Sequence, residues 1–317
     1  MDLYYGVYGL RLAATVRIPF LRELPDTLGL PDIAVSFEEG KPLATVQEDK
    51  PWYQAPSAPG EGPELVAYRE PETRRVRFRY AGGTVFDYDL GNGRLTACWL
   101  LPQTFEDACT YLVGPILGFA LQMRHRACLH ASVAAIGDSA VAFVGPNGSG
   151  KSTLAAALLR RGARIVTEDV AAIERRAGGI CAHYGPRAIR LWSPSVTALY
   201  GYPNALPQIS KHWGKQYLTL DERDNEWEQG ASLRAIYLLE VSGSNAPVAC
   251  EPLAPAAAVG KLMANIYPGW LPIPEARVAI LDTLIDLVAA LPVARLSLPS
   301  RFARLNDVCD YLLARHA

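Results

Sequence analysis

The sequence has few lysines, no excess of charge of either sign and no long hydrophobic run. Only six of its 31 basic residues are lysines, and the formal net charge is −1. The chain therefore has no overall positive field, and we expect neither nucleic acid nor an anionic membrane as its main partner. The uncharged, strongly apolar stretch Ala108–Met123 has 16 residues. Because roughly 20 residues are needed to cross a bilayer, we expect a buried helix there.

The sequence also lacks paired cysteines and an obvious leader. None of the six cysteines forms a Cys-x-x-Cys pair, which argues against a zinc knuckle or a dithiol redox motif. The first residues, MDLYYGVYGLRL, show no basic segment followed by an apolar core, so we expect no signal peptide. Scattered cysteines in apolar surroundings are typical of a reducing compartment, and we expect a cytoplasmic protein. The oligomeric state stays open, a homo-oligomer included.

Length and composition predict two domains. The chain has 317 residues, half of them hydrophobic, and about 150 residues per domain is the usual scale. We expect residues 1–103 to form a smaller β-rich domain, with substrate recognition as its candidate role. Residues 51–63 are rich in proline and glycine and predict an exposed loop. The expected strands lie at 4–16, 32–37, 64–68, 75–80 and 84–88.

Residues 104–317 alternate strand and helix patterns, which predicts an α/β domain with a mixed sheet. A helix capped by Thr104 should run to about residue 124. In the helix expected at 274–291, Val278, Leu281, Ile285 and Val288 recur at helical spacing and predict its core face. The other expected helices are 152–161, 194–200, 255–265 and 300–315, and the expected strands are 129–136, 140–144, 164–173, 216–220, 233–241 and 293–298.

A complete phosphate-binding motif follows an apolar strand and opens an apolar helix. Residues 145–152 read Gly-Pro-Asn-Gly-Ser-Gly-Lys-Ser, which fits G-x-x-x-x-G-K-[ST]. Its glycines let successive N–H groups point at phosphate oxygens, Lys151 can reach the β- and γ-phosphates, and Ser152 can ligate magnesium. We therefore predict ATP and Mg²⁺ as cofactors. The residues expected to hold them are Gly145, Pro146, Asn147, Gly148, Ser149, Gly150, Lys151, Ser152 and Thr153.

Two adjacent acids follow this loop closely. Glu168 and Asp169 interrupt the apolar stretch Arg164–Ile173, 17 and 18 residues after Lys151. Neighbouring residues on a strand point to opposite faces, so both acids can reach one site only if the strand ends there. One acid could then hold magnesium while the other accepts a proton from an incoming hydroxyl. The chain has neither an LSGGQ-like segment nor an Asn-Lys-x-Asp guanine reader, which argues against transporter-type ATPases and GTPases.

Three further side chains are candidates for the same site. His130 begins a strand whose hairpin partner leads into the loop, which places its imidazole near the phosphates. Arg190 could clamp a phosphate or pack against Trp192. Lys215, which we favour over Lys211, could bring a cation to the transferred phosphoryl group.

His130, the loop with Lys151, and the Glu168–Asp169 pair occur in the order and spacing of HPr kinase/phosphorylase. The segment 127–175 resembles that family strongly, and the rest of the C-terminal domain resembles it loosely. The family belongs to the group whose P-loop fold is like that of phosphoenolpyruvate carboxykinase. Over its whole length the chain is similar to HPr-kinase-like kinases of lasso-peptide precursors and other ribosomal peptides.

The resemblance implies roles for the matched residues. Lys151 and Ser152 would take phosphate and magnesium, Glu168 would be the general base, Asp169 a metal ligand, and His130 would orient the base. The chain departs from the family in having Glu where the family has Asp at position 168. It also lacks the downstream Glu-x-Arg-Gly-Leu-Gly signature. The resemblance therefore supports the kinase reaction more strongly than the phosphorylase reaction, and more strongly than it supports HPr as the substrate.

Together these features predict an ATP- and Mg²⁺-dependent kinase that phosphorylates a serine of a peptide or small protein, with a lasso-type precursor as the candidate acceptor. The alternative is a P-loop module that hydrolyses ATP to drive a partner's conformational change. Glu240, at the end of the apolar stretch Leu233–Leu239, is the acid that this alternative would use.

Overall fold

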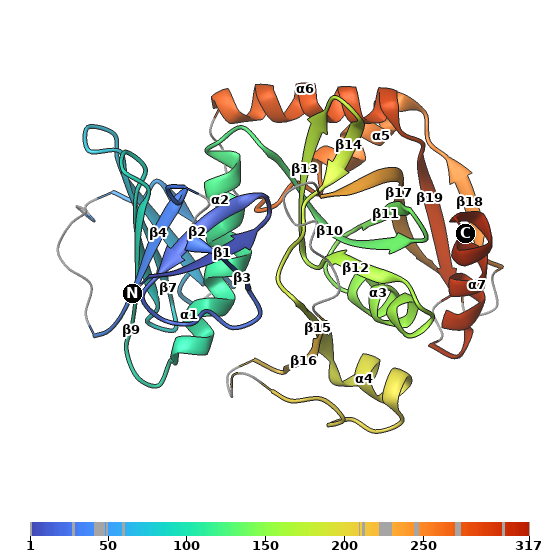
Figure 1. Cartoon of the computed structure of the whole chain (residues 1–317), viewed down its shortest axis with the longest axis horizontal. Coiled ribbons are helices and arrows are strands. Elements are labelled where there is room, and N and C mark those ends of the chain that lie inside the picture. Colours follow the sequence, from blue (N-terminus) through green and yellow to red (C-terminus); the bar gives the residue numbers. More distant parts are fainter. Residues whose placement is uncertain are drawn as a thin grey trace. The chain divides into compact units, whose positions relative to one another are not determined.

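The computed structural model describes residues 2–26, 29–40, 48, 50–58, 61–208, 210, 213–221, 230–243, 247–269, 274–299 and 302–316. The chain folds as two compact units, 1–116 and 117–317. The mixed α/β class expected from the sequence is confirmed (Figure 1). In the described part of the chain, no helix combines the length and apolar character that a bilayer crossing requires.

The first unit is built on a nine-stranded sheet with the order β3-β1-β2-β4-β9-β8-β7-β6-β5. Its core contains fully buried aromatic side chains, among them Tyr5, Phe78 and Phe86. The strands are β1 (Leu3–Val7), β2 (Leu10–Ala14), β3 (Arg22–Leu24), β4 (Ile33–Glu39), β5 (Tyr53–Gln54), β6 (Leu65–Glu70), β7 (Arg75–Tyr80), β8 (Val85–Asp89) and β9 (Arg94–Trp99).

This unit differs from the prediction in several details, and strands β3 and β9 were not expected. The strand expected over 4–16 is a hairpin of β1 and β2, because Tyr8 and Gly9 both adopt positive φ and turn the chain. The loop expected at 51–63 contributes the short strand β5, which pairs with β6.

The units divide at residue 116, whereas we expected the boundary at 103. Helix α1 (Phe105–Tyr111) belongs with the first sheet, because Tyr111 stacks on Tyr80 and Phe105 meets the edge of Phe37. The predicted helix 104–124 is also not continuous. Thr104 caps it as expected, but Gly114 has non-helical dihedrals, and a π-helical segment (Leu112–Ile116) separates α1 from α2 (Leu117–Gln122).

The second unit has an eight-stranded mixed sheet and a separate two-stranded hairpin. The path runs β11-β10-β13-β14-β17-β19-β18, with β12 beside β10 and β17 also pairing with β11. The sheet strands are β10 (Ala127–Ile136), β11 (Ser139–Val144), β12 (Arg164–Thr167), β13 (Val170–Arg176), β14 (Gly179–Ala182), β17 (Ala231–Ser242), β18 (Ala249–Pro252) and β19 (Val293–Pro299); the hairpin is β15 (Ala188–Trp192) and β16 (Lys215–Thr219).

Helices cover this sheet on both faces. Helix α3 (Lys151–Arg160) buries an alanine- and leucine-rich face against Phe143 of β11 and Tyr237 of β17, and α7 (Leu305–His316) packs beside it. Figure 1 shows α6 (Pro274–Ala290) lying over β13 and β14. The remaining elements are α4 (Ser193–Tyr200), α5 (Pro255–Met263) and a 3₁₀ turn, η3 (Phe302–Arg304).

The predicted core face of α6 is wrong. Val278, Leu281 and Ile285 are exposed, Val278 to 63%, and Val288 is only partly buried. The buried side chains are instead Ala276, Ile280, Leu284 and Leu287. This helix carries apolar residues around most of its circumference, so the sequence pattern is compatible with more than one buried face. Packing against the sheet determines which face is buried.

Candidate functional site

The phosphate-binding loop joins β11 to α3. Gly148 and Gly150 adopt φ values of +80° and +91°, which side chains with a Cβ rarely adopt, and Gly150 is the N-cap of α3. The first turn of the helix therefore presents unpaired N–H groups and the positive end of its dipole at the loop. This geometry is that of an anion site.

Lys151 lies buried at the start of α3 and curls back over the loop. Its Nζ donates hydrogen bonds to the carbonyl oxygens of Gly145 (2.7 Å) and Pro146 (2.9 Å). Burial lowers the pKa of the Lys151 ammonium to about 8, although Asp169 and Glu168 act in the opposite direction. The carbonyls hold the ammonium where a phosphate oxygen can replace them.

The two acids lie at a break between β12 and β13. We expected one strand over 164–173, but it ends at Thr167 and a new strand begins at Val170. Asp169 has a φ of +71°, a strained value for a residue with a Cβ. The Thr167 hydroxyl donates to the Val170 carbonyl (2.6 Å) and stabilises the break. This local strain lets both carboxylates reach the same site.

Glu168 connects the acid pair to the loop. Its Oε1 accepts a 2.6 Å hydrogen bond from the Ser152 hydroxyl, and its Oε2 accepts one from Arg190 Nε (3.3 Å). The side chain is only 4% exposed. A serine hydroxyl beside a carboxylate is a donor set of oxygens, which suits Mg²⁺.

Asp169 is held by two cationic or potentially cationic groups. Arg190 Nη2 donates to its Oδ2 (2.6 Å), and His130 Nδ1 lies 3.2 Å from its Oδ1. Burial raises the pKa of the Asp169 carboxyl, but Arg190 and His130, followed by Lys215 and Lys151, outweigh it, and the net pKa lies below the usual value. Its side chain is 19% exposed, more than that of Glu168.

His130 bridges Asp169 and the loop. Its Nδ1 also lies 3.2 Å from the Asp169 carbonyl, and its Nε2 lies 3.0 Å from the side-chain oxygen of Asn147. Burial lowers the pKa of His130, which favours the neutral ring. A neutral ring has a single N–H, and the Asp169 oxygens at Nδ1 can only accept, so this proton is on Nδ1. Nε2 then has to accept, which requires the Asn147 amide to be rotated so that its NH₂ group faces the ring. The Tyr267 ring stacks on the imidazole, with centroids 5.5 Å apart.

The β15–β16 hairpin supplies the site's other cations. Arg190 on β15 contacts both acids, through Nε to Glu168 and Nη2 to Asp169, and its predicted role as a phosphate clamp stays a prediction. Lys215 starts β16 with its ammonium 5.3 Å from the centre of the Trp192 ring, and its charge acts on Asp169 and Lys151. Lys211 lies outside the described residues.

The structure thus brings together most of the predicted side chains and separates one. His130, Asn147, Ser152, Glu168, Asp169 and Arg190 form one connected network, and the charge of Lys151 acts on both acids. Glu240, the acid of the ATPase alternative, instead pairs with Arg295 (3.2 Å) and is 57% exposed. Sequence reasoning missed Tyr267, which lies far from His130 along the chain, and no local pattern marks it.

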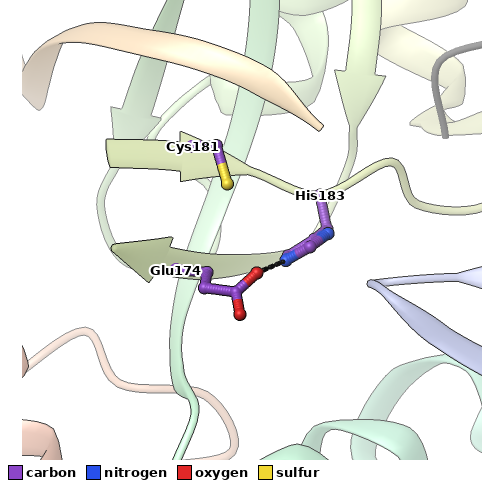
Figure 2. Close-up of side chains that lie close together, drawn as sticks. All are labelled: Glu174, Cys181 and His183. Carbon is purple, nitrogen blue, oxygen red and sulfur yellow. Dashed lines mark hydrogen bonds and ion pairs between the residues drawn. The ribbon is translucent and has the colours of Figure 1, made fainter. Parts of the chain in front are cut away.

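A second polar cluster lies on the β13–β14 hairpin (Figure 2). Glu174 stands opposite Cys181, and His183 Nε2 lies 2.9 Å from Glu174 Oε2. The donor atoms of the three side chains lie within 4.8 Å of one another. However, Arg176 Nε donates to the same Glu174 oxygen (2.8 Å), and this positive charge opposes a metal cation. We interpret the cluster as a set of hydrogen bonds that stabilises the hairpin.

Comparison with known proteins finds similarity at the level of structure. No family model matches the chain, and no curated protein matches it. The solved structure of the Hpr(Ser) kinase/phosphatase from Coxiella burnetii is similar over 60% of this chain and 99% of its own, with 11% sequence identity and a TM-score of 0.31. A similarity of this size assigns no family, so the function must be inferred from the residues of the site.

Proposed function

We propose that the protein is an ATP- and Mg²⁺-dependent phosphotransferase that phosphorylates a serine of a peptide or small protein. One observation carries the proposal: the Ser152–Glu168 hydrogen bond joins the phosphate loop directly to an acid pair whose second member, Asp169, contacts His130. A loop that only binds phosphate has no need of this connected acid, histidine and arginine network.

The loop residues would bind the triphosphate. Lys151 would exchange the carbonyls of Gly145 and Pro146 for phosphate oxygens, and the N–H groups at the start of α3 would hold the remaining charge. The oxygens of Ser152 and Glu168 fit Mg²⁺ and would hold it, and the bound ion would neutralise negative charge on the phosphates.

The contacts favour exchanging the roles that the family resemblance implies for the two acids: Glu168 would hold the metal and Asp169 would be the general base. Glu168 lies against Ser152, on the metal side, and is almost fully buried. Asp169 is more exposed and is oriented by His130, so an incoming hydroxyl reaches it more easily. Asp169 would accept the hydroxyl proton as the serine oxygen bonds to the γ-phosphorus and the bond to the β–γ bridging oxygen breaks, releasing ADP.

A polypeptide acceptor is supported by two features. The matched His, loop and acid pair resemble a family that phosphorylates serine in a protein. The first unit, residues 1–116, also carries a sheet with β3 and β5 as the ends of its strand order, and an extended peptide can add to such an edge. The second candidate, an ATP-hydrolysing module, would use Glu240, but that carboxylate is occupied by Arg295.

The test is phosphate transfer from γ-labelled ATP to the peptides or small proteins encoded beside the gene, read by mass spectrometry. We expect one phosphate on a serine, and at least about a hundredfold slower transfer with a folded Lys151→Ala variant. Efficient phosphorylation of a free sugar or amino acid with no modified peptide would contradict the polypeptide acceptor. Equal turnover by wild type and Lys151→Ala would contradict the loop as the ATP site.

A further inference from the structure

A cavity of about 190 Å³ opens beside the phosphate loop, and neither acid of the pair is among its lining residues. One wall is the loop and the first turn of α3. The opposite wall is formed by the ends of β17 and β19, the turn η3 and the start of α7. The lining residues are Gly148, Ser149, Gly150, Thr153, Leu154, Val241, Leu298, Pro299, Phe302, Leu305 and Val308.

The far wall of this cavity is apolar and partly open to solvent. Phe302 is 49% exposed and Val241 54% exposed, although both border a depression lined by buried aliphatic side chains such as Leu298 and Val308. An aromatic ring and aliphatic groups at the rim of an apolar cavity favour a flat ligand that removes them from water.

The position of the cavity relative to the loop indicates which part of a nucleotide it would face. Ser152 points to Glu168 and thus to the reacting end of the triphosphate. Thr153, the next residue along the helix, lines the cavity instead. Because consecutive helical residues are turned by about 100° from each other, the two sides of the first turn face different ends of a bound nucleotide.

The polar side chains of the lining are hydroxyls. Ser149 Oγ is buried and has no hydrogen-bond partner among the described residues, while the Thr153 hydroxyl is bonded to Ser195 (2.7 Å). A free hydroxyl can donate or accept, so it suits both adenine and guanine. The described lining contains no amide or charged side chain that would read the edge of a base.

We propose that this cavity is the nucleobase subsite, with Phe302 as its stacking surface, and that it binds adenine and guanine with little discrimination. The proposal rests on the nucleotide-binding part of the proposed function, since it requires a nucleoside triphosphate at the loop but not transfer to a peptide. Ring stacking and aliphatic contact supply the binding, and both are insensitive to which purine is present.

The test measures Mg²⁺-dependent binding of ATP, GTP and inorganic tripolyphosphate by calorimetry to the full-length chain. Phe302→Ala should weaken ATP and GTP binding about tenfold, the usual scale for loss of one base–aromatic contact, and leave tripolyphosphate binding unchanged. Val278→Ala, at an exposed apolar residue of α6 that does not line the cavity, is the matched control and should change none of the three. Wild type should bind ATP and GTP within about tenfold of each other.

A second variant, Val241→Trp, fills the cavity from its exposed rim and should weaken ATP and GTP binding while tripolyphosphate still binds. Unchanged ATP affinity in both cavity variants, with tripolyphosphate bound, would overturn the proposal. A preference of wild type for one purine above about tenfold would overturn the low discrimination. If the Phe302 effect is found but no peptide is phosphorylated, the proposed function fails and the subsite is supported.

Discussion

The two sides of the first turn of α3 differ in every physical respect, although Ser152 and Thr153 are neighbours in the sequence. The Ser152 side is charged and mostly buried: Ser152 bonds to Glu168, and Arg190 bonds to both acids. The Thr153 side is apolar and partly open. This difference is the basis of the two proposals above, in which the charged side transfers the phosphate and the apolar side binds the base.

The largest expected effect separates the two acids. Asp169→Asn removes the proposed base and should lower turnover by about 10²–10⁴-fold with little change in nucleotide affinity. Glu168→Gln should chiefly raise the Mg²⁺ concentration needed for half-maximal rate, because it weakens the oxygen set around Ser152. Steady-state kinetics over a Mg²⁺ titration measures both. If Glu168→Gln instead lowers turnover and Asp169→Asn instead raises the Mg²⁺ requirement, Glu168 is the general base, as the family resemblance implies.

Removing the loop cation tests the charged side as a whole. Lys151→Ala should lower phosphate transfer by about 10²–10³-fold, the usual cost of losing one group that stabilises transition-state charge. It should also weaken tripolyphosphate and ATP binding in parallel. If only ATP binding were weakened and tripolyphosphate binding were not, Lys151 would contact the nucleobase rather than the phosphates. That result would contradict the proposed separation of the charged side from the apolar side.

Nucleotide affinity should depend on pH through the same lysine. Since the pKa of Lys151 is lowered to about 8, the free protein loses this cation as the pH rises through 8, while bound phosphate favours the protonated form. ATP affinity should therefore be flat below pH 8 and fall by about tenfold per pH unit above it. Calorimetry between about pH 7 and 9.5 measures this, and Lys151→Arg, which stays charged, is the control.

The smallest effect concerns the contact between the loop and His130. Asn147→Ala removes the partner of His130 Nε2 but leaves the Asp169 contacts in place. We expect turnover to fall a few-fold, about the worth of one neutral hydrogen bond, with unchanged ATP affinity. A larger loss of affinity than of turnover would mean that Asn147 binds nucleotide rather than positioning His130.

Much of the site was predictable because its chemistry is local. The loop motif needs a fixed order of glycines, lysine and serine between a strand and a helix, and the structure has all of these between β11 and α3. The hairpin of β10 and β11 explains why His130 comes near the loop. The cavity proposed to bind the nucleobase was not predictable, because its walls come from α3, β17, β19 and α7, which are far apart in the sequence.

Short-range order and hydrophobic pattern were enough to specify the phosphate loop, the nearby acid pair and the mixed α/β class. How those parts are used depends on the folded chain. Folding broke the strand at Glu168 and Asp169 so that both carboxylates face one site, and it brought Arg190 from a separate hairpin to hold them. It also placed Ile280 rather than Val278 in the buried stripe of α6. These outcomes depend on contacts between distant segments, in which burial and charge pairing outweigh local preference.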